Sequence, residues 1–171
     1  RLERARALGA EAVDFDAEDP VEAVRELTRG AGVDRAIDAV GVDATAPRRH
    51  GRKPPARNWV PGDAPAQALE WAVALVAKAG TVSIIGVYPQ TEKRFPIGEA
   101  MNKNLTVKAG NCYHRRYVPM LVDMVRSGKV RPSEVLTQMK PLASAIEAYK
   151  AFDLRKPGWV KVELRPAAQA A

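Results

Sequence analysis

LEWAVALVAKAGTVSIIGV, residues 69–87, joins a helical pattern to the most strand-like run of the chain. Four apolar residues in its first half recur at helical spacing: Leu69, Ala72, Val73 and Val76. Such a stripe predicts a helix that packs one face against a sheet, with Gly80 as the residue beyond its end. The run from Thr81 to Val87 is then predicted to be a strand of that sheet.

The residues before this stretch repeat the alternation of helix and strand. Arg1 to Leu8 is predicted to be the end of an amphipathic helix, and Ala12 to Phe15 a short strand. Asp19 followed by Pro20 predicts a new helix, because Asp caps helix starts and Pro suits the first helical position. Asp34 to Val40 is the next expected strand.

The residues after it continue the pattern towards the C-terminus. The expected elements are one or two helical turns in 97–103, a strand in 105–109, helices in 117–127 and around 142–152, and a strand in 159–164. The two helices are expected to pack through apolar stripes, the first through Leu121, Met124 and Val125 and the second through Leu142, Ile146, Tyr149 and Phe152. Strands that alternate with helices predict an α/β fold with a parallel sheet.

Composition restricts the classes to which the chain can belong. Its 171 residues are 46% hydrophobic and 27% charged, which is ordinary for a globular protein and long enough for one domain with a core. No apolar run approaches the ~20 residues of a membrane span, and the single cysteine excludes an internal disulfide framework. We therefore expect no membrane partner and a reducing, cytoplasmic location.

The excess positive charge is concentrated in one loop. Of the net charge of +7, five units come from residues 44–62, which hold Arg48, Arg49, Arg52, Lys53 and Arg57 and no acid. With its prolines, the segment 43–65 is predicted to be a basic, Pro-rich loop insertion. One hypothesis is a non-catalytic module that uses this loop to hold an anion or a nucleic acid. The aromatic residues that interleave a nucleic-acid groove are lacking, so nucleic acid is not the expected partner.

Two features of a complete dinucleotide-binding sheet are not found in the chain. Such a sheet has a glycine-rich turn after its first strand and an acid at the end of its second. This chain opens on a helix instead. We therefore expect a partial Rossmann-type doubly wound parallel sheet that lacks its first two strands. Ala12 to Phe15 would be its strand 3, left without a neighbour, and Asp34 to Val40 its strand 4.

Several segments, taken in order, point to a known family. RLERARALGA (1–10), GAGVDRAIDAVG (30–41) and GTVSIIGVY (80–88) resemble the zinc-dependent medium-chain alcohol dehydrogenases. FPIG (95–98), MNKNLT (101–106) and GNCYHR (110–115) look like the formaldehyde-dehydrogenase-like branch of that family. VLTQ (135–138) and GWVKVEL (158–164) are similar to its closing stretch, where the chain returns to the catalytic domain.

The resemblance implies an oxidoreductase that moves hydride between a zinc-bound alcohol or aldehyde and NAD or NADP. In this family the zinc acts as a Lewis acid, and its ligands come from an N-terminal domain that this chain lacks. Residues 1–132 would be the second part of the dinucleotide-binding domain, residues 133–166 a return segment to the catalytic domain, and residues 167–171 a frayed tail. A zinc-free quinone reductase of the same superfamily is the alternative enzyme.

The resemblance also implies how subunits associate. In this family the strand that corresponds to Leu105–Ala109 pairs with its twin across a two-fold axis, so a homodimer or homotetramer is expected. The expected substrate is a small alcohol or aldehyde.

Cofactor contacts are carried over to this chain by the same resemblance. Ala39, Val40 and Gly41 form one strand end, and Ile85, Gly86 and Val87 form another, whose backbone would meet the nicotinamide carboxamide. Open α/β sheets bind ligands at such carboxyl ends. Outlying residues complete the set: Arg1 for the adenosine ribose, Lys161 for the pyrophosphate, and His114 with Arg115 for the nicotinamide or the phosphates.

Each of these residues also has a plain structural explanation, as a turn glycine, a core strand or a solvated charge. No catalytic or metal-ligating residue is assigned to the chain. Cys112 and His114 resemble a ligand pair, but two ligands without partners are too few for a metal site.

Overall fold

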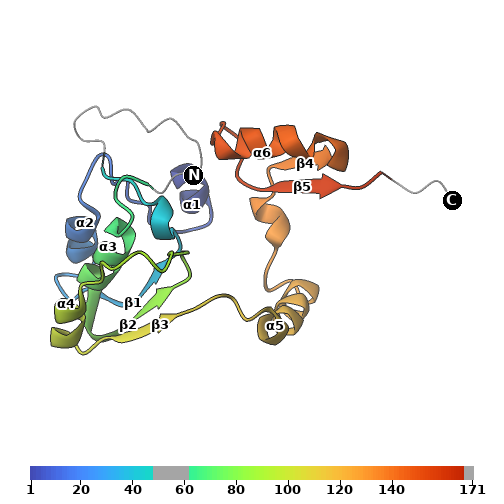
Figure 1. Ribbon diagram of the computed structural model, residues 1–171. Helices are drawn as coiled ribbons and strands as arrows, with labels where there is room; N and C mark the ends of the chain where they lie inside the picture. Colours follow the sequence, from blue (N-terminus) through green and yellow to red (C-terminus); the bar gives the residue numbers. More distant parts are fainter. Residues whose placement is uncertain (48–61, 168–171) are drawn as a thin grey trace. The chain divides into compact units, whose positions relative to one another are not determined.

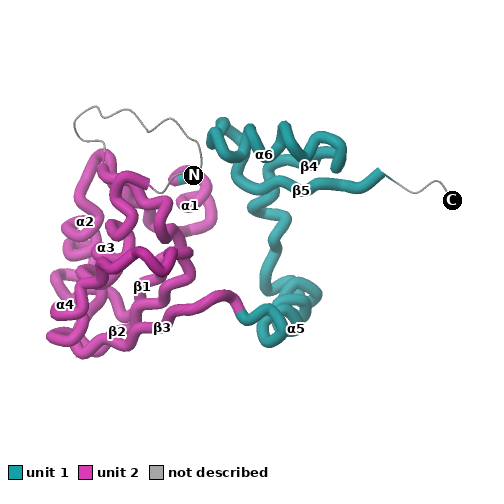
Figure 2. The backbone as a smooth tube through the Cα atoms, in the orientation of Figure 1, with its two compact units in different colours: residues 1, 113–171 teal, residues 2–112 magenta. Residues whose placement is uncertain are grey.

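The computed structural model describes residues 1–47 and 62–167 of the chain (Figure 1). They fall into two compact units, residues 2–112 and residues 113–171 with Arg1, each of which is described by itself (Figure 2). The basic residues Arg48 to Arg57 lie outside the described residues, as does most of the predicted tail. The assignment of residues 1–132 to a dinucleotide-binding domain stays a prediction.

The larger unit is built on a three-stranded parallel sheet in the order β1-β2-β3, which confirms the predicted partial Rossmann-type fold. Its strands are β1 (Val33–Asp38), β2 (Val76–Ile84) and β3 (Thr106–Ala109). Its helices are α1 (Leu2–Ala7), α2 (Pro20–Leu27), α3 (Gln67–Leu75) and α4 (Ile97–Asn102), with a 3₁₀ turn, η1, at Gly41–Asp43. Figure 1 shows the three strands side by side, with their carboxyl ends at one edge.

The core lies between α3 and the sheet, as the stripe in residues 69–76 predicts. Leu69, Ala72, Val73 and Val76 are all buried, and Val73 is fully inaccessible to solvent. Val82 of β2 and Ala100 of α4 complete the buried cluster. Helix α2 begins as predicted, because the Asp19 carboxylate accepts the N–H groups of Val21 and Glu22 at 2.8 and 3.3 Å.

The junction between α3 and β2 differs from the expected glycine cap. The helix ends at Leu75 and the strand begins at the next residue, so Gly80 lies inside β2. A Cβ at Gly80 would come within 2.8 Å of the Asp34 carbonyl oxygen, so the glycine allows strands to approach rather than ending a helix. The last turn of α3 is instead capped by Lys103, whose ammonium donates to the carbonyls of Val73 and Ala74, both at 2.9 Å.

The predicted strand at Ala12–Phe15 is wrong. This segment forms no ladder with another part of the described chain, although the Ala12 carbonyl accepts a hydrogen bond from the Arg6 guanidinium at 3.0 Å. A β-strand is defined by hydrogen bonds to a neighbouring strand, and the described residues place no strand beside this segment. The predicted strand 81–87 also stops short, at Ile84.

In its described residues, the smaller unit contains two α-helices, two short 3₁₀ helices and a two-stranded parallel sheet. Its elements are α5 (His114–Arg126), η2 (Pro132–Val135), β4 (Gln138–Pro141), η3 (Leu142–Ser144), α6 (Ala145–Asp153) and β5 (Val162–Arg165). Gln138 pairs with Val162. Strand β5 overlaps the predicted strand 159–164 in residues 162–164, starts three residues later and ends one residue later. None of the helices in the described residues is long and apolar enough to cross a bilayer.

Most of the apolar residues expected to be buried in these two helices are exposed, and Met124 is only partly buried. On α5, Leu121 and Val125 are each 45% accessible, and α6 leaves Ile146 and Tyr149 even more open. The buried side of α6 is the face with Ala148 and Ala151. Helical periodicity identifies an apolar face, but burial needs a packing partner, which the described residues do not supply.

Candidate functional site at the ends of β1 and β2

The carboxyl ends of β1 and β2 lie side by side, because Asp38 pairs with Ile84 in the parallel ladder. Beyond the ladder, the Asp38 carbonyl accepts the N–H groups of Ile85 and Gly86, both at 2.9 Å. The Val42 N–H donates to the Val87 carbonyl at 3.1 Å. Two of the predicted site segments, residues 39–41 and 85–87, are therefore brought together by backbone hydrogen bonds.

Two glycines allow this close approach. Gly41 adopts a φ of +66°, in the left-handed region, and a Cβ there would overlap the backbone of Val87. A Cβ at Gly86 would overlap the backbone nitrogen of Gly41. The sequence suggests that Gly86 is glycine so that a cofactor can come close, but the structure gives a different reason: the two strand ends need the space themselves.

Asp38 lies beneath these two glycines and was not among the predicted site residues. It is 2% exposed and is the buried charged side chain of the described residues. Its Oδ1 accepts the N–H groups of Val40 and Gly41 at 2.9 and 3.1 Å, and its Oδ2 accepts the hydroxyl of Tyr88 at 2.7 Å. The sequence signal that could have identified it is an acid at the end of a buried strand, close before a glycine.

Tyr88 completes the arrangement from the segment that follows β2. Burial, together with the hydrogen bond to Asp38 and the negative charges of Asp38 and Glu92, raises the pKa of Tyr88 well above its ordinary value. The phenol therefore remains neutral and continues to donate to Asp38 at any physiological pH. The hydrogen bond between Asp38 and Tyr88 thus links the end of β1 to the segment that follows β2.

Three apolar side chains project from the same strand ends: Val40, Ile85 and Val87. They are 50%, 65% and 70% exposed, and we call them the strand-end ledge. An exposed apolar surface beside buried polar groups suits a flat ligand that has both ring faces and hydrogen-bonding edges. The strand-end ledge is therefore an exposed apolar surface at the carboxyl ends of β1 and β2, and its cofactor role stays a prediction.

The other predicted site residues belong to the smaller unit. His114 and Arg115 form the first turn of α5, and their side chains are exposed, as is that of Arg1. The backbone of Lys161 holds β5 to β4, since its carbonyl accepts the N–H groups of Thr137 and Gln138 at 3.0 and 3.1 Å. The Lys161 side chain is exposed. The cofactor roles of these residues stay predictions.

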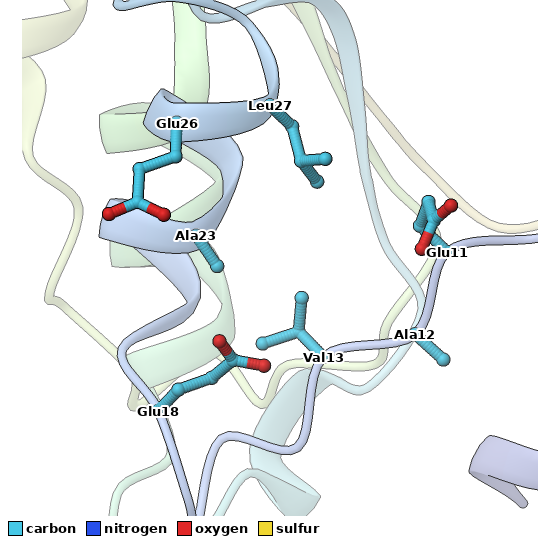
Figure 3. Close-up of a pocket in the computed structure, with 7 residues that line it drawn as sticks. All are labelled: Glu11, Ala12, Val13, Glu18, Ala23, Glu26 and Leu27. Atoms are coloured by element: carbon cyan, nitrogen blue, oxygen red, sulfur yellow. The ribbon is translucent and has the colours of Figure 1, made fainter.

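A cavity of about 420 Å³ lies elsewhere, between the segment that begins at Glu11 and helix α2 (Figure 3). Figure 3 shows its lining: Glu11, Ala12, Val13, Glu18, Ala23, Glu26 and Leu27. None of the predicted site residues is among them. The cavity adjoins the segment that was predicted to be strand 3 and that forms no ladder.

Metal-ligating side chains do not converge in the described part of the chain, where no three His, Cys, Asp or Glu residues could hold an ion together. Cys112 is an exposed free thiol. The described residues therefore do not provide a zinc ligand set.

The chain is similar along nearly its whole length to zinc-type alcohol dehydrogenase-like proteins. It is 32% identical to the uncharacterized protein AdhB of Bacillus subtilis, over 97% of this chain and 43% of the relative. It is 33% identical to a zinc-type alcohol dehydrogenase-like protein of Schizosaccharomyces pombe, over 95% of this chain and 38% of the relative. Thus the chain spans about two fifths of the length of the curated relatives it matches. No family model matches it.

Solved structures give the same result. The alcohol dehydrogenase TADH from Thermus sp. ATN1 superposes with a TM-score of 0.78 and 28% identity, covering 96% of this chain and 41% of that one. The homologues of this chain are therefore alcohol dehydrogenases, with a Rossmann-type fold. This result does not favour the nucleic-acid hypothesis, and the formaldehyde-dehydrogenase-like branch stays a prediction.

Proposed function

We propose that this chain is the second part of the cofactor domain, with its return segment, of an alcohol or aldehyde oxidoreductase that uses NAD or NADP. Similarity to alcohol dehydrogenases along almost the entire chain supports this proposal. The structural observation that supports it most is the joined carboxyl ends of β1 and β2, held by the buried Asp38. Ligands of open α/β sheets bind at this edge.

The nicotinamide end of the cofactor is assigned to the two joined strand ends, residues 39–41 and 85–87. The strand-end ledge would contact one face of the ring, and backbone groups between Ile85 and Val87 would meet its carboxamide. Gly41 and Gly86 would act indirectly, by allowing the strand ends to pack and so fixing where these backbone groups lie.

The charged residues of the smaller unit are assigned to the polar parts of the cofactor. Lys161 would meet the pyrophosphate oxygens, for which a cationic side chain is suited. His114 and Arg115 would lie beside the nicotinamide or the phosphates, and Arg1 beside the adenosine ribose. Zinc, when bound, would polarise the substrate oxygen as a Lewis acid. We propose that the zinc ligands lie in the region of the full-length protein that corresponds to the part of the relatives outside the match with this chain.

The proposed partners are a small alcohol or aldehyde and further copies of the same protein, in a cytoplasmic setting. β3 is the last strand of the described sheet, and all four of its residues are exposed. An unpaired strand edge can extend a sheet into a second subunit. This supports a homodimer or homotetramer that associates through β3.

The function is tested on the full-length protein with three measurements. Zinc content by metal analysis, binding of NADH and NADPH by fluorescence, and oxidation of a series of primary alcohols should show a zinc enzyme that binds one nucleotide and reduces it. Failure to bind either nucleotide would overturn the proposal. Reduction of quinones by a protein without zinc would favour the alternative enzyme of the same superfamily.

A further inference from the structure

The charge of Asp38 lies directly behind the proposed nicotinamide site. Asp38 is 2% exposed, and the hydrogen bonds that its carboxylate accepts from Val40 and Gly41 place it under the first of the two strand ends. Gly86 of the second strand end is equally close, since a Cβ there would lie 3.0 Å from Asp38 Oδ1. A ligand that binds over these strand ends would therefore be separated from the carboxylate by little more than the backbone of Gly41 and Gly86.

The hydrogen-bond partners of Asp38 do not neutralise this charge. Each one found in the described residues is a neutral donor: the N–H of Val40, the N–H of Gly41 and the hydroxyl of Tyr88. In all three contacts the Asp38 side chain accepts and in none does it donate, which is the hydrogen-bond pattern of a carboxylate. Water, which would screen the charge, has little access to it.

A buried charge acts over a longer distance than an exposed one, because the protein interior has a low effective dielectric constant. The two redox forms of the nicotinamide ring differ in charge: the oxidised ring is positive and the reduced ring is neutral. A negative charge behind the ring therefore interacts differently with the two forms, while shape and apolar contacts are nearly the same for both.

We propose that Asp38 is a specificity-determining residue that makes the site favour the oxidised over the reduced nicotinamide. The inference rests on the proposed function, because it takes the ring to bind over the ends of β1 and β2. Tyr88 moderates the effect, since its hydroxyl dipole points at Oδ2 and offsets part of the charge. A purely structural Asp38 would instead affect the binding of both redox forms alike.

The test measures the dissociation constants of the oxidised and the reduced nucleotide for the full-length protein and its variants. Asp38→Asn keeps a side-chain oxygen for the two N–H groups and an amide that can donate to the tyrosine oxygen, but it removes the charge. We expect the dissociation constant of the oxidised nucleotide to rise about tenfold and that of the reduced nucleotide to change less than about twofold. Asp43→Asn, at an exposed carboxylate of η1, is the matched control. It should leave the ratio of the two dissociation constants, oxidised to reduced, unchanged.

Tyr88→Phe keeps the charge of Asp38 and removes the hydroxyl dipole that offsets it. We therefore expect the ratio of the dissociation constant of the oxidised nucleotide to that of the reduced nucleotide to fall about twofold, so that the oxidised form is favoured more strongly. This variant tests the inference even if Asp38→Asn does not fold. Parallel weakening of both redox forms, or an unchanged ratio, in either variant would overturn the inference. If the parent protein binds neither nucleotide, the proposed function itself fails, and the two failures are thus distinguishable.

Discussion

Gly86 lies where the ends of β1 and β2 touch, and this contact determines the effect of replacing it. A Cβ at Gly86 would overlap backbone atoms of Gly41, which cannot move aside as a flexible side chain could. We expect Gly86→Ala to lower the free energy of unfolding of the full-length protein by ~2–3 kcal/mol and to weaken nucleotide binding as well.

Gly98→Ala is the matched control for this substitution. Gly98 lies in helix α4, and a Cβ there would meet nothing within 4 Å. Alanine is the better helix former, so the control should raise stability by up to ~1 kcal/mol. Urea denaturation measures both, and a Gly86→Ala variant as stable as the parent would contradict the packing of the strand ends.

Ala79 shows backbone strain that glycine would relieve. Its φ is +62°, in the left-handed region, and its side chain is exposed. Replacement by glycine removes the clash between Cβ and backbone but increases the freedom of the unfolded chain. We expect Ala79→Gly to raise the free energy of unfolding by ~0.5–1 kcal/mol.

The same replacement at Ala74, inside helix α3, should have the opposite sign and lower stability by ~1 kcal/mol. The thermal unfolding midpoints of the two variants give the comparison. If both variants lose stability equally, Ala79 does not have the left-handed conformation.

At the scale of elements, Lys103 joins α4 to the end of α3. Its ammonium donates to the carbonyls of Val73 and Ala74 and forms an ion pair with Glu99 at 2.9 Å. Lys103→Met keeps the apolar stem and removes these contacts, so two helix-end carbonyls lose a partner. We expect a loss of ~1–2 kcal/mol in the free energy of unfolding.

Glu99→Gln separates the cap from the ion pair. It removes only the charge of a half-exposed partner, so it should cost less than ~0.5 kcal/mol. The free energies of unfolding of Lys103→Met and Glu99→Gln, measured by chemical denaturation, show whether the helix cap or the ion pair contributes more. Equal losses would show that the ion pair, and not the helix cap, stabilises the junction.

Elements that depend on local pattern could be predicted from the sequence, and those that depend on distant partners could not. The stripe from Leu69 to Val76 and the Asp19 cap each lie within one segment, and both are confirmed. The Lys103 cap joins residues about thirty positions apart, and no local pattern reveals it. Ala12 to Phe15 has the composition of a strand but no ladder partner in the described chain.

The candidate site, too, could be predicted only in part. The resemblance to the alcohol dehydrogenases indicated residues 39–41 and 85–87, at the ends of predicted strands, and the structure brings these segments together. Asp38 was missed because an acid in a strand pattern is usually exposed. Its burial depends on the N–H groups of Val40 and Gly41 together with the hydroxyl of Tyr88, which lies fifty positions further along the chain. The approach of Gly86 to the backbone of Gly41 was also missed, because it joins two strand ends far apart in the sequence; the cofactor role of Gly86 stays a prediction.

At the scale of the whole molecule, the described surfaces predict how the 171-residue chain behaves alone. β1 has an unpaired edge in the described sheet, and α5 and α6 expose apolar side chains. Unpaired edges and exposed apolar faces promote association. We expect the chain, expressed by itself, to form dimers or larger aggregates in light scattering. A single monomeric species with a cooperative thermal transition would contradict this expectation.

The central claim, that the ends of β1 and β2 hold the nicotinamide, is tested most directly at the strand-end ledge. Ile85 is 65% exposed, so Ile85→Glu should leave the unfolding midpoint of the full-length protein unchanged while a charge is placed against the ring. Ile97→Glu, at a residue 60% exposed in α4, is the matched control. The measurement is the dissociation constant of the reduced nucleotide by fluorescence titration. We predict that Ile85→Glu raises it at least about tenfold and that Ile97→Glu leaves it unchanged. Equal affinity in the parent and in Ile85→Glu would contradict the claim.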